Sequence, residues 1–263
     1  MRQRWEWGMG AALILMMLLL ANVGMKKIFS AAAQTGAAGV SFASTGARGA
    51  EEDAGPGSAE ENDAGEKDPE SGWTHIVAID SGHGGIDPGK VGVHGEEEKD
   101  INLAIAQRVQ SLLEANDILV VMTRDSDEGL YDESDSNKKM ADLTARCALI
   151  NESGAELAVS IHQNSYHDDS VCGPQMFCYR DSEEGERLAR CLQQTFLSVQ
   201  PQNTRDIKYN DNYYILLHVE CPIVVAECGF LSNWEESELL MQEEYQEQVA
   251  WAITMGILTY LNT

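Results

Sequence analysis

Short apolar runs alternate with amphipathic stretches along the chain from Trp73 onward. The apolar runs are rich in β-branched residues, which is typical of strands, and they occupy residues 75–80, 118–123, 156–161, 175–179 and 222–227. Most of them are continuously apolar, as expected for strands that are covered on both faces of a sheet. The pattern therefore predicts a buried sheet built from these runs.

Helical periodicity fills the intervals between the predicted strands. Apolar residues recur at helical spacing in four segments, marked by Ile101, Ile105, Val109 and Leu112; by Leu143, Cys147 and Ile150; by Leu188, Leu192 and Phe196; and by Val249, Ile253 and Ile257. Strands that alternate with helices indicate βαβ units. We therefore expect residues 73–263 to form a single α/β domain with a mostly parallel, helix-covered mixed sheet.

The first 72 residues do not share this pattern. An apolar run at residues 9–25 has basic residues on both sides and is barely long enough to span a bilayer. Residues 1–30 are predicted to be a signal anchor, or a cleaved signal peptide whose site is "SAAAQ" at 30–34. Residues 31–72 are mostly Ala, Gly, Ser, Glu and Asp, which predicts a disordered acidic tether. In either case we expect the remainder of the chain to be exported.

Length and charge narrow the class of protein. The chain has 263 residues and 43% hydrophobic content, which suits one sizeable core but not two domains. Its formal net charge is −25. Phosphate backbones and anionic lipid surfaces attract basic proteins, so we expect no nucleic-acid partner and membrane contact only through the N-terminal segment.

The six cysteines do not form a metal-binding pattern. Their spacing contains no CxxC pair, which excludes a structural zinc knuckle. A disulfide between Cys172 and Cys178 and a set of small buried hydrophobic thiols both remain open.

Polar side chains follow three of the predicted strands. His83 comes three residues after the first strand, His162 directly follows the third, and Glu227 ends the last. Ligands in parallel α/β folds gather at the carboxyl ends of the strands, so these groups are expected to converge. Glu98, at the start of the first predicted helix, is a fourth candidate. Two imidazoles and a carboxylate, with one position left to water, are typical of a catalytic zinc site.

Other interpretations of these residues compete with a metal site. Glu98 lies in the run "EEE" at 96–98, and such a run is usually a solvated face or a favourable helix N-terminus. His94 is a rival ligand by its position. Glu227 follows five apolar residues, where an ionised carboxylate is costly to bury without a partner. A nearby cation would provide that partner.

Six segments carry a resemblance to a known family. They are "DSGHGGIDPG", "GEEEKDINLAIA", "VMTRDSD", "DLTARCALIN", "SIHQNS" and "VVAECGFLSN". In order and approximate spacing they resemble the zinc-dependent N-acetylmuramoyl-L-alanine amidases, over residues 75–262. The resemblance implies one Zn²⁺ per chain, held by His83, Glu98 and His162, with Glu227 as the catalytic carboxylate. It also selects Glu98 within its acidic run, because Lys99 follows it.

The resemblance implies cleavage of the amide bond between N-acetylmuramic acid and L-alanine in peptidoglycan. An N-terminal anchor, a short tether and no wall-binding repeat are most similar to the sporulation and germination-specific amidases, which act in muramic-lactam formation in the spore cortex. The implied location is the outer face of the cytoplasmic membrane, the cell wall or the forespore intermembrane space. The sequence leaves open a regulatory protein partner without identifying it.

Three further residues are candidates for contacting the substrate. Asn164 shares a motif with His162, and Arg124 and Arg146 could recognise substrate carboxylates. The two arginines could equally form structural ion pairs. Two other functions remain to be separated from amidase activity: a non-catalytic peptidoglycan-binding or regulatory module, and a zinc peptidase that cuts within the stem peptide.

Overall fold

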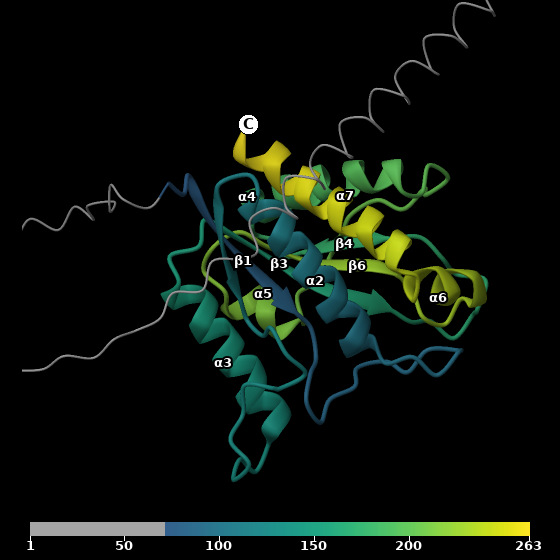
Figure 1. The fold of residues 1–263 in the computed structure, drawn as a ribbon, viewed down its shortest axis with the longest axis horizontal. Helices are drawn as coiled ribbons and strands as arrows, with labels where there is room; N and C mark the ends of the chain where they lie inside the picture. Colours follow the sequence, from purple (N-terminus) through teal and green to yellow (C-terminus); the bar gives the residue numbers. More distant parts are fainter. Residues whose placement is uncertain (1–71) are drawn as a thin grey trace, which may run out of the picture. The chain divides into compact units, whose positions relative to one another are not determined.

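The computed structural model describes residues 72–263, which form a six-stranded sheet with helices on both faces (Figure 1). The strands are β1 His75–Ser81, β2 Ile118–Met122, β3 Leu157–Asn164, β4 Gln175–Cys178, β5 Lys208–Tyr209 and β6 Ile223–Phe230. The helices are α2 Glu98–Glu114, α3 Lys138–Glu152, α4 Glu183–Thr195, α5 Tyr214–His218, α6 Trp234–Leu240 and α7 Glu243–Leu261, with a 3₁₀ turn, η1, at Phe196–Ser198.

The sheet is mixed: four neighbouring strands are parallel, and the remaining two run in the opposite direction. Its order is β2-β1-β3-β6-β4-β5. The pairs formed by β1 with β2, β1 with β3 and β3 with β6 are parallel, whereas β4 is antiparallel to β6 and parallel to β5. The predicted single α/β domain with a mostly parallel mixed sheet is therefore confirmed.

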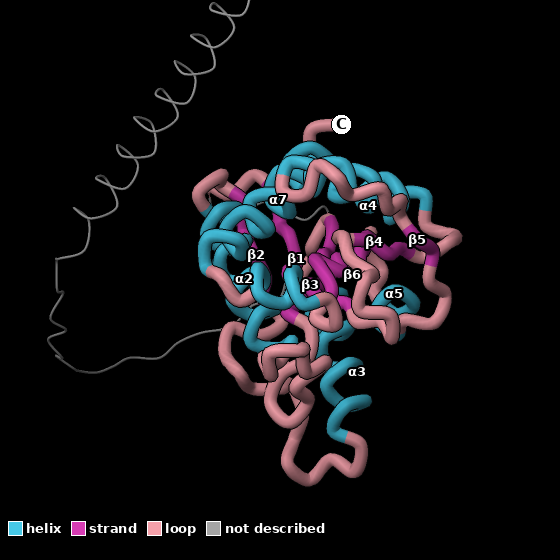
Figure 2. Tube along the Cα trace, turned by 90° about the vertical axis from the view of Figure 1, so that its right-hand side faces the viewer, coloured by secondary structure: helices cyan, strands magenta, loops and turns pink. Residues whose placement is uncertain are grey.

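Side-chain alternation along the strands divides the core into two layers. Helices α4 and α7 lie on one side of the strands and α3 on the other (Figure 2). Val77 and Ile79 of β1 join the core that lies against α2, α4 and α7. Ala78, between them, joins the smaller core against α3 and α5. Because both faces are covered, the strands can be continuously apolar, as their sequences are.

The predictions for the N-terminal part lie outside the described residues. These are the signal anchor or signal peptide at 1–30 and, apart from Gly72, the tether at 31–72. Within residues 72–263, no helix combines the length and apolar composition that crossing a bilayer requires.

All six cysteine thiols are free. Cys178 is buried in β4 and Cys172 is exposed, so the disulfide considered for this pair does not form in the structure. The thiols of Cys147, Cys178 and Cys228 lie in the core as small apolar groups.

Candidate functional site

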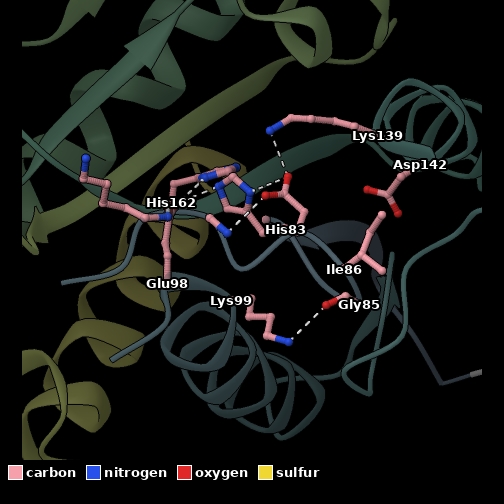
Figure 3. Close-up of polar contacts among 12 residues, drawn as sticks. His83, Gly85, Ile86, Glu98, Lys99, Lys139, Asp142 and His162 are labelled. Atoms are coloured by element: carbon pink, nitrogen blue, oxygen red, sulfur yellow. Dashed lines mark hydrogen bonds and ion pairs between the residues drawn. The ribbon is translucent and has the colours of Figure 1, made fainter. Parts of the chain in front are cut away.

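His83, Glu98 and His162 come together at the carboxyl end of the parallel strands. Each offers one ligand atom to a group whose members all lie within 4.8 Å of one another. Nε2 of His83 is 3.2 Å from Oε2 of Glu98, and Nδ1 of His162 is 2.9 Å from Oε1 of the same carboxylate. The imidazole rings meet edge to face, 4.9 Å apart (Figure 3). Residues separated by up to 79 positions in the chain thus form one cluster.

These separations suit a divalent zinc ion. Zinc bonds to nitrogen and carboxylate oxygen are about 2.0–2.2 Å long, which places tetrahedral ligand atoms roughly 3.3–3.6 Å apart. The distances from His83 Nε2 and His162 Nδ1 to the Glu98 oxygens, 3.2 and 2.9 Å, lie slightly below this range, because the paired atoms are within hydrogen-bonding distance. Two imidazoles and one carboxylate also form the donor set of open catalytic zinc sites. The residues therefore fit the metal that the sequence predicts.

The turn after β1 presents His83 in an unusual backbone conformation. His83 has a φ of 62°, in the left-handed region that costs a non-glycine residue about 1–3 kcal/mol. Its Nδ1 lies 3.0 Å from Oδ2 of Asp87, which leaves Nε2 directed at Glu98. At Gly82, a Cβ atom would lie only 2.3 Å from the His162 ring. The glycine therefore allows the second imidazole to approach the end of β1.

Glu98 is held at the start of α2 by main-chain hydrogen bonds. Its side chain is 5% exposed, and it accepts hydrogen bonds from the main-chain N–H groups of Lys90 and Gln163, at 2.8 and 3.0 Å. Burial opposes its ionisation, but the hydrogen bonds and charges of His162 and His83 outweigh burial and hold its pKa well below the usual range. Glu98 is therefore a buried anionic group that could bind a metal, and it is not part of a solvated acidic face.

His162 and Glu227 are cross-strand neighbours. They are paired in the parallel register of β3 and β6, so both side chains stand on the same face of the sheet. Burial opposes protonation of His162, but its hydrogen bond to Glu98 and the charge of that carboxylate raise its pKa to about 9. A metal at this site therefore replaces a proton on the imidazole.

Glu227 is buried with one carboxylate oxygen unpartnered in the part of the chain that the structure describes. It is 7% exposed, and its Oε2 has no hydrogen-bond partner among residues 72–263. Burial raises its pKa to about 7, against the opposing charge of His162. A carboxyl group with such a pKa can both accept and release a proton near neutral pH.

Arg124 and Arg146 are directed into the fold. Arg124 is 4% exposed and donates to the main-chain carbonyls of Ser81, Gly82, Lys99 and Ser126. Arg146 is 1% exposed and donates to the carbonyl of His83 and to the carboxylates of Asp80 and Asp142. These contacts favour a structural role for both arginines over substrate recognition, because they hold the turn that carries His83. Arg146 does so as part of a buried ion pair, as the sequence allows, whereas the hydrogen bonds of Arg124 go to main-chain carbonyls.

The buried pair of Arg146 and Asp80 gives a prediction for stability. Nη1 of Arg146 is 2.8 Å from Oδ1 of Asp80, and both side chains are 2% exposed. We expect Arg146→Met to lower the free energy of unfolding by about 3–5 kcal/mol, because it leaves a buried carboxylate uncompensated. Urea unfolding followed by circular dichroism measures the change.

The exposed pair of Arg190 and Glu186 supplies a matched control. Their N–O distance is also 2.8 Å, but water screens the charges, so Arg190→Met should cost much less stability. Equal losses in the two variants would contradict a special role for the buried pair. The pH dependence of the free energy of unfolding offers a second check. Burial opposes the ionisation of Asp80, but the charge of Arg146 and the hydrogen bonds to the carboxylate outweigh burial and lower the pKa of Asp80 to about 2. This carboxylate therefore stabilises the fold fully above its ordinary pKa of 3.8 and loses that contribution as the pH falls through about 2.

The remaining sequence candidates lie apart from the cluster. His94 packs on the ring of Trp234, with centroids 4.2 Å apart, and its Nε2 contacts the main-chain oxygen of that residue. The cluster therefore forms without this rival histidine. Asn164 lies at the end of β3, where its Oδ1 accepts from the N–H of Ser165. Its role toward the substrate remains a prediction.

Three supporting residues were not found by sequence reasoning. Asp87 orients His83, Asn102 donates to the carbonyl of Gly82 from the α2 helix, and Asp80 anchors Arg146. A metal-binding histidine commonly donates its second N–H to a carboxylate. The carboxylate four residues after His83 in the glycine-rich turn was the available signal for Asp87.

Comparison with known proteins identifies related sequences and solved structures. A family model described as N-acetylmuramoyl-L-alanine amidase matches residues 77–259. The germination-specific N-acetylmuramoyl-L-alanine amidase of Bacillus subtilis (strain 168) is 40% identical over 189 residues, covering 70% of this chain and 79% of that protein. The CwlD amidase from Clostridioides difficile, solved in complex with the GerS lipoprotein, matches with a TM-score of 0.70 at 39% identity, over 72% of this chain and 98% of that chain. The catalytic domain of CwlV, an N-acetylmuramoyl-L-alanine amidase from Bacillus (Paenibacillus) polymyxa var. colistinus, gives 0.64 at 32% identity, over 72% and 98%.

Proposed function

The chain belongs to the N-acetylmuramoyl-L-alanine amidases, and from this premise we propose that His83, Glu98 and His162 hold one catalytic Zn²⁺ with Glu227 as the general base. As a member of this family, it is an enzyme that hydrolyses the amide bond between N-acetylmuramic acid and L-alanine in peptidoglycan. The observation that carries the site proposal is the three-residue cluster beside a buried carboxylate with an unpartnered oxygen.

The residues divide the reaction between binding and proton transfer. When bound, zinc supplies Lewis-acid chemistry, lowering the pKa of a water molecule and polarising a carbonyl. Glu227 accepts a proton from the attacking water through its free Oε2. The water oxygen bonds to the lactyl carbonyl carbon, the C–N bond breaks, and Glu227 returns the proton to the departing amine of L-alanine. The products are a stem peptide with a free amine and muramic acid with a free lactyl carboxylate.

Digestion of purified peptidoglycan tests the proposal. We expect mass analysis of the products to show intact stem peptides separated from intact glycan strands. Fragments cut within the stem peptide would instead identify a zinc peptidase. Binding without cleavage by the zinc-loaded protein would identify a non-catalytic peptidoglycan-binding or regulatory module.

We also propose a role in the spore cortex. The Bacillus subtilis relative is named as germination-specific, which supports a function in removing peptides from muramic acid during muramic-lactam formation. Loss of the gene should then abolish muramic lactam in cortex fragments. Cortex with normal muramic lactam in the deletion strain would contradict this role.

The chain organisation and a partner are parts of the proposal. Residues 1–30 would export the protein as an anchor or a cleaved signal, and residues 31–72 would tether the catalytic domain, residues 73–263, outside the cytoplasm. The complex of the Clostridioides difficile amidase with a lipoprotein supports a regulatory protein partner for this chain. The substrate itself lies outside the cytoplasm, in the cell wall or between the forespore membranes.

A further inference from the structure

The metal cluster opens into two adjoining cavities. The inner one, of about 60 Å³, is lined by His83 and His162. The outer one, of about 200 Å³, is lined by Ile86 and Tyr131 among others. Three residues line both cavities, namely Asp87, Lys139 and Asp142. A ligand bound at the cluster can therefore extend over Lys139 into the outer cavity.

Lys139 reaches the cluster through one carboxylate. Its Nζ is 2.9 Å from Oδ2 of Asp87, and the same oxygen lies 3.0 Å from Nδ1 of His83 (Figure 3). The Lys139 side chain is 63% exposed, so its ammonium group remains accessible to a ligand.

Helix stability does not account for this lysine. Lys138 and Lys139 occupy the first turn of α3, which contains no acidic residue. Cations at a helix N-terminus oppose the helix dipole, where Asp or Glu would be favourable. The ion pair with Asp87 is exposed to solvent on the lysine side and is therefore screened, so it contributes little to stability. A function in the cavity is a better explanation for a cation at this position.

The charge of the protein makes such a cation useful. The chain has a net charge of −25, which repels anionic ligands. The stem peptide of peptidoglycan carries carboxylates. The Arg146 side chain is 2% exposed, and that of Lys138, which pairs with Glu133 over the ring of Tyr131, is 20% exposed, whereas that of Lys139 is 63% exposed. Among the cations that line the two cavities, Lys139 is therefore the one best placed to meet a substrate carboxylate.

We infer that Lys139 binds a carboxylate of the stem peptide and so selects substrates whose carboxylate near the scissile bond is free. The inference rests on the proposed function, because it places the scissile amide at the His83, Glu98 and His162 cluster. The flexible side chain of Lys139 lets its ammonium group donate to the substrate and to Asp87 together. Its role is in binding, and it takes no part in proton transfer.

Two substrates that differ only in the charge of their stem-peptide carboxylates test this inference. One is a muropeptide with free stem-peptide carboxylates, and the other is the same compound with those carboxylates converted to carboxamides. For Lys139→Gln in the zinc-loaded protein, we expect kcat/KM on the free-carboxylate substrate to fall about 10-fold, mainly through KM. On the carboxamide substrate we expect no change. Lys139→Arg should restore most of the loss, because it keeps the charge.

Controls separate binding from positioning. Lys208→Gln, an exposed lysine on β5, should leave kcat/KM unchanged on both substrates. Zinc content of Lys139→Gln should equal that of the wild type. An equal loss on both substrates, or a loss of zinc, would show that Lys139 only positions His83 through Asp87, and would overturn the inference. No loss on either substrate would overturn it as well.

Binding of the released stem peptide provides a readout that does not depend on cleavage. By calorimetry, the wild type should bind the peptide with free carboxylates more tightly than its carboxamide form, and Lys139→Gln should bind the two alike. The preference of the wild type should also weaken with salt, because the contact is electrostatic and exposed. A wild type that binds both peptides equally would refute the carboxylate site. A wild type that shows the preference but cleaves no muropeptide would refute the proposed function alone.

Discussion

Replacement of Glu227 by glutamine is expected to lower turnover by roughly 10²–10⁴-fold, the usual contribution of a general acid–base residue. The amide keeps the shape of the side chain and its hydrogen-bonding capacity but cannot accept the proton of water. Because Glu227 is not one of the three clustered ligands, zinc content should stay at the wild-type level. Zinc analysis, thermal unfolding and muropeptide cleavage measured on the same preparation give the three quantities required.

Glu236 provides a matched control for this experiment. It is also a buried glutamate, 5% exposed, but its carboxylate accepts hydrogen bonds from the N–H groups of Gly173 and Phe230, each at 2.9 Å. Glu236→Gln should therefore lower stability while turnover per folded molecule changes little. If the folded, zinc-loaded Glu227→Gln protein cleaved muropeptides as the wild type does, Glu227 would not be the general base.

The main elements of the fold were predictable because each has a strong local pattern. Buried strands such as β1 and β6 are continuous apolar runs, and long helices such as α2 repeat their apolar residues at helical spacing. The two-residue strand β5 and the five-residue helix α5 are too short to produce such a pattern, and both were missed. The antiparallel direction of β4 depends on its pairing with β6, which no local pattern encodes.

The clustered residues were predictable to the extent that topology brings strand ends together. His162 and Glu227 follow or end apolar runs, and parallel pairing of β3 and β6 places them side by side. Glu98 was harder, because its acidic run reads as a solvated surface and only the family resemblance distinguished it. The destinations of Arg124 and Arg146 could not be predicted, because a long side chain can reach either solvent or the main chain of a distant turn.

Removal of the metal is also expected to cause a large loss of activity. We expect the domain, residues 73–263, to bind one zinc ion per chain and to lose activity when a chelator removes it. His162→Ala should fold and bind zinc much more weakly, because it removes one of three proposed ligands, whose ligand atoms lie within 4.8 Å of one another. His162 lies at the carboxyl end of β3, with its ring partly exposed to the cavity, so its loss should affect ligation more than packing.

His94→Ala is the matched control for the metal experiment, because it removes an imidazole that packs on Trp234 instead of joining the cluster. Zinc stoichiometry after dialysis, a zinc competition titration and circular dichroism should be measured on the wild type and both variants. We expect His94→Ala to retain wild-type affinity while His162→Ala loses it and stays folded.

Weak binding by His94→Ala with normal binding by His162→Ala would transfer the ligand role to His94. Unfolding of His162→Ala together with loss of metal would indicate a structural zinc, since only a site required for folding couples the two losses. A zinc-free domain with full activity would refute the metal mechanism, because the lactyl amide would then be cleaved without the Lewis acid that the cluster is proposed to hold.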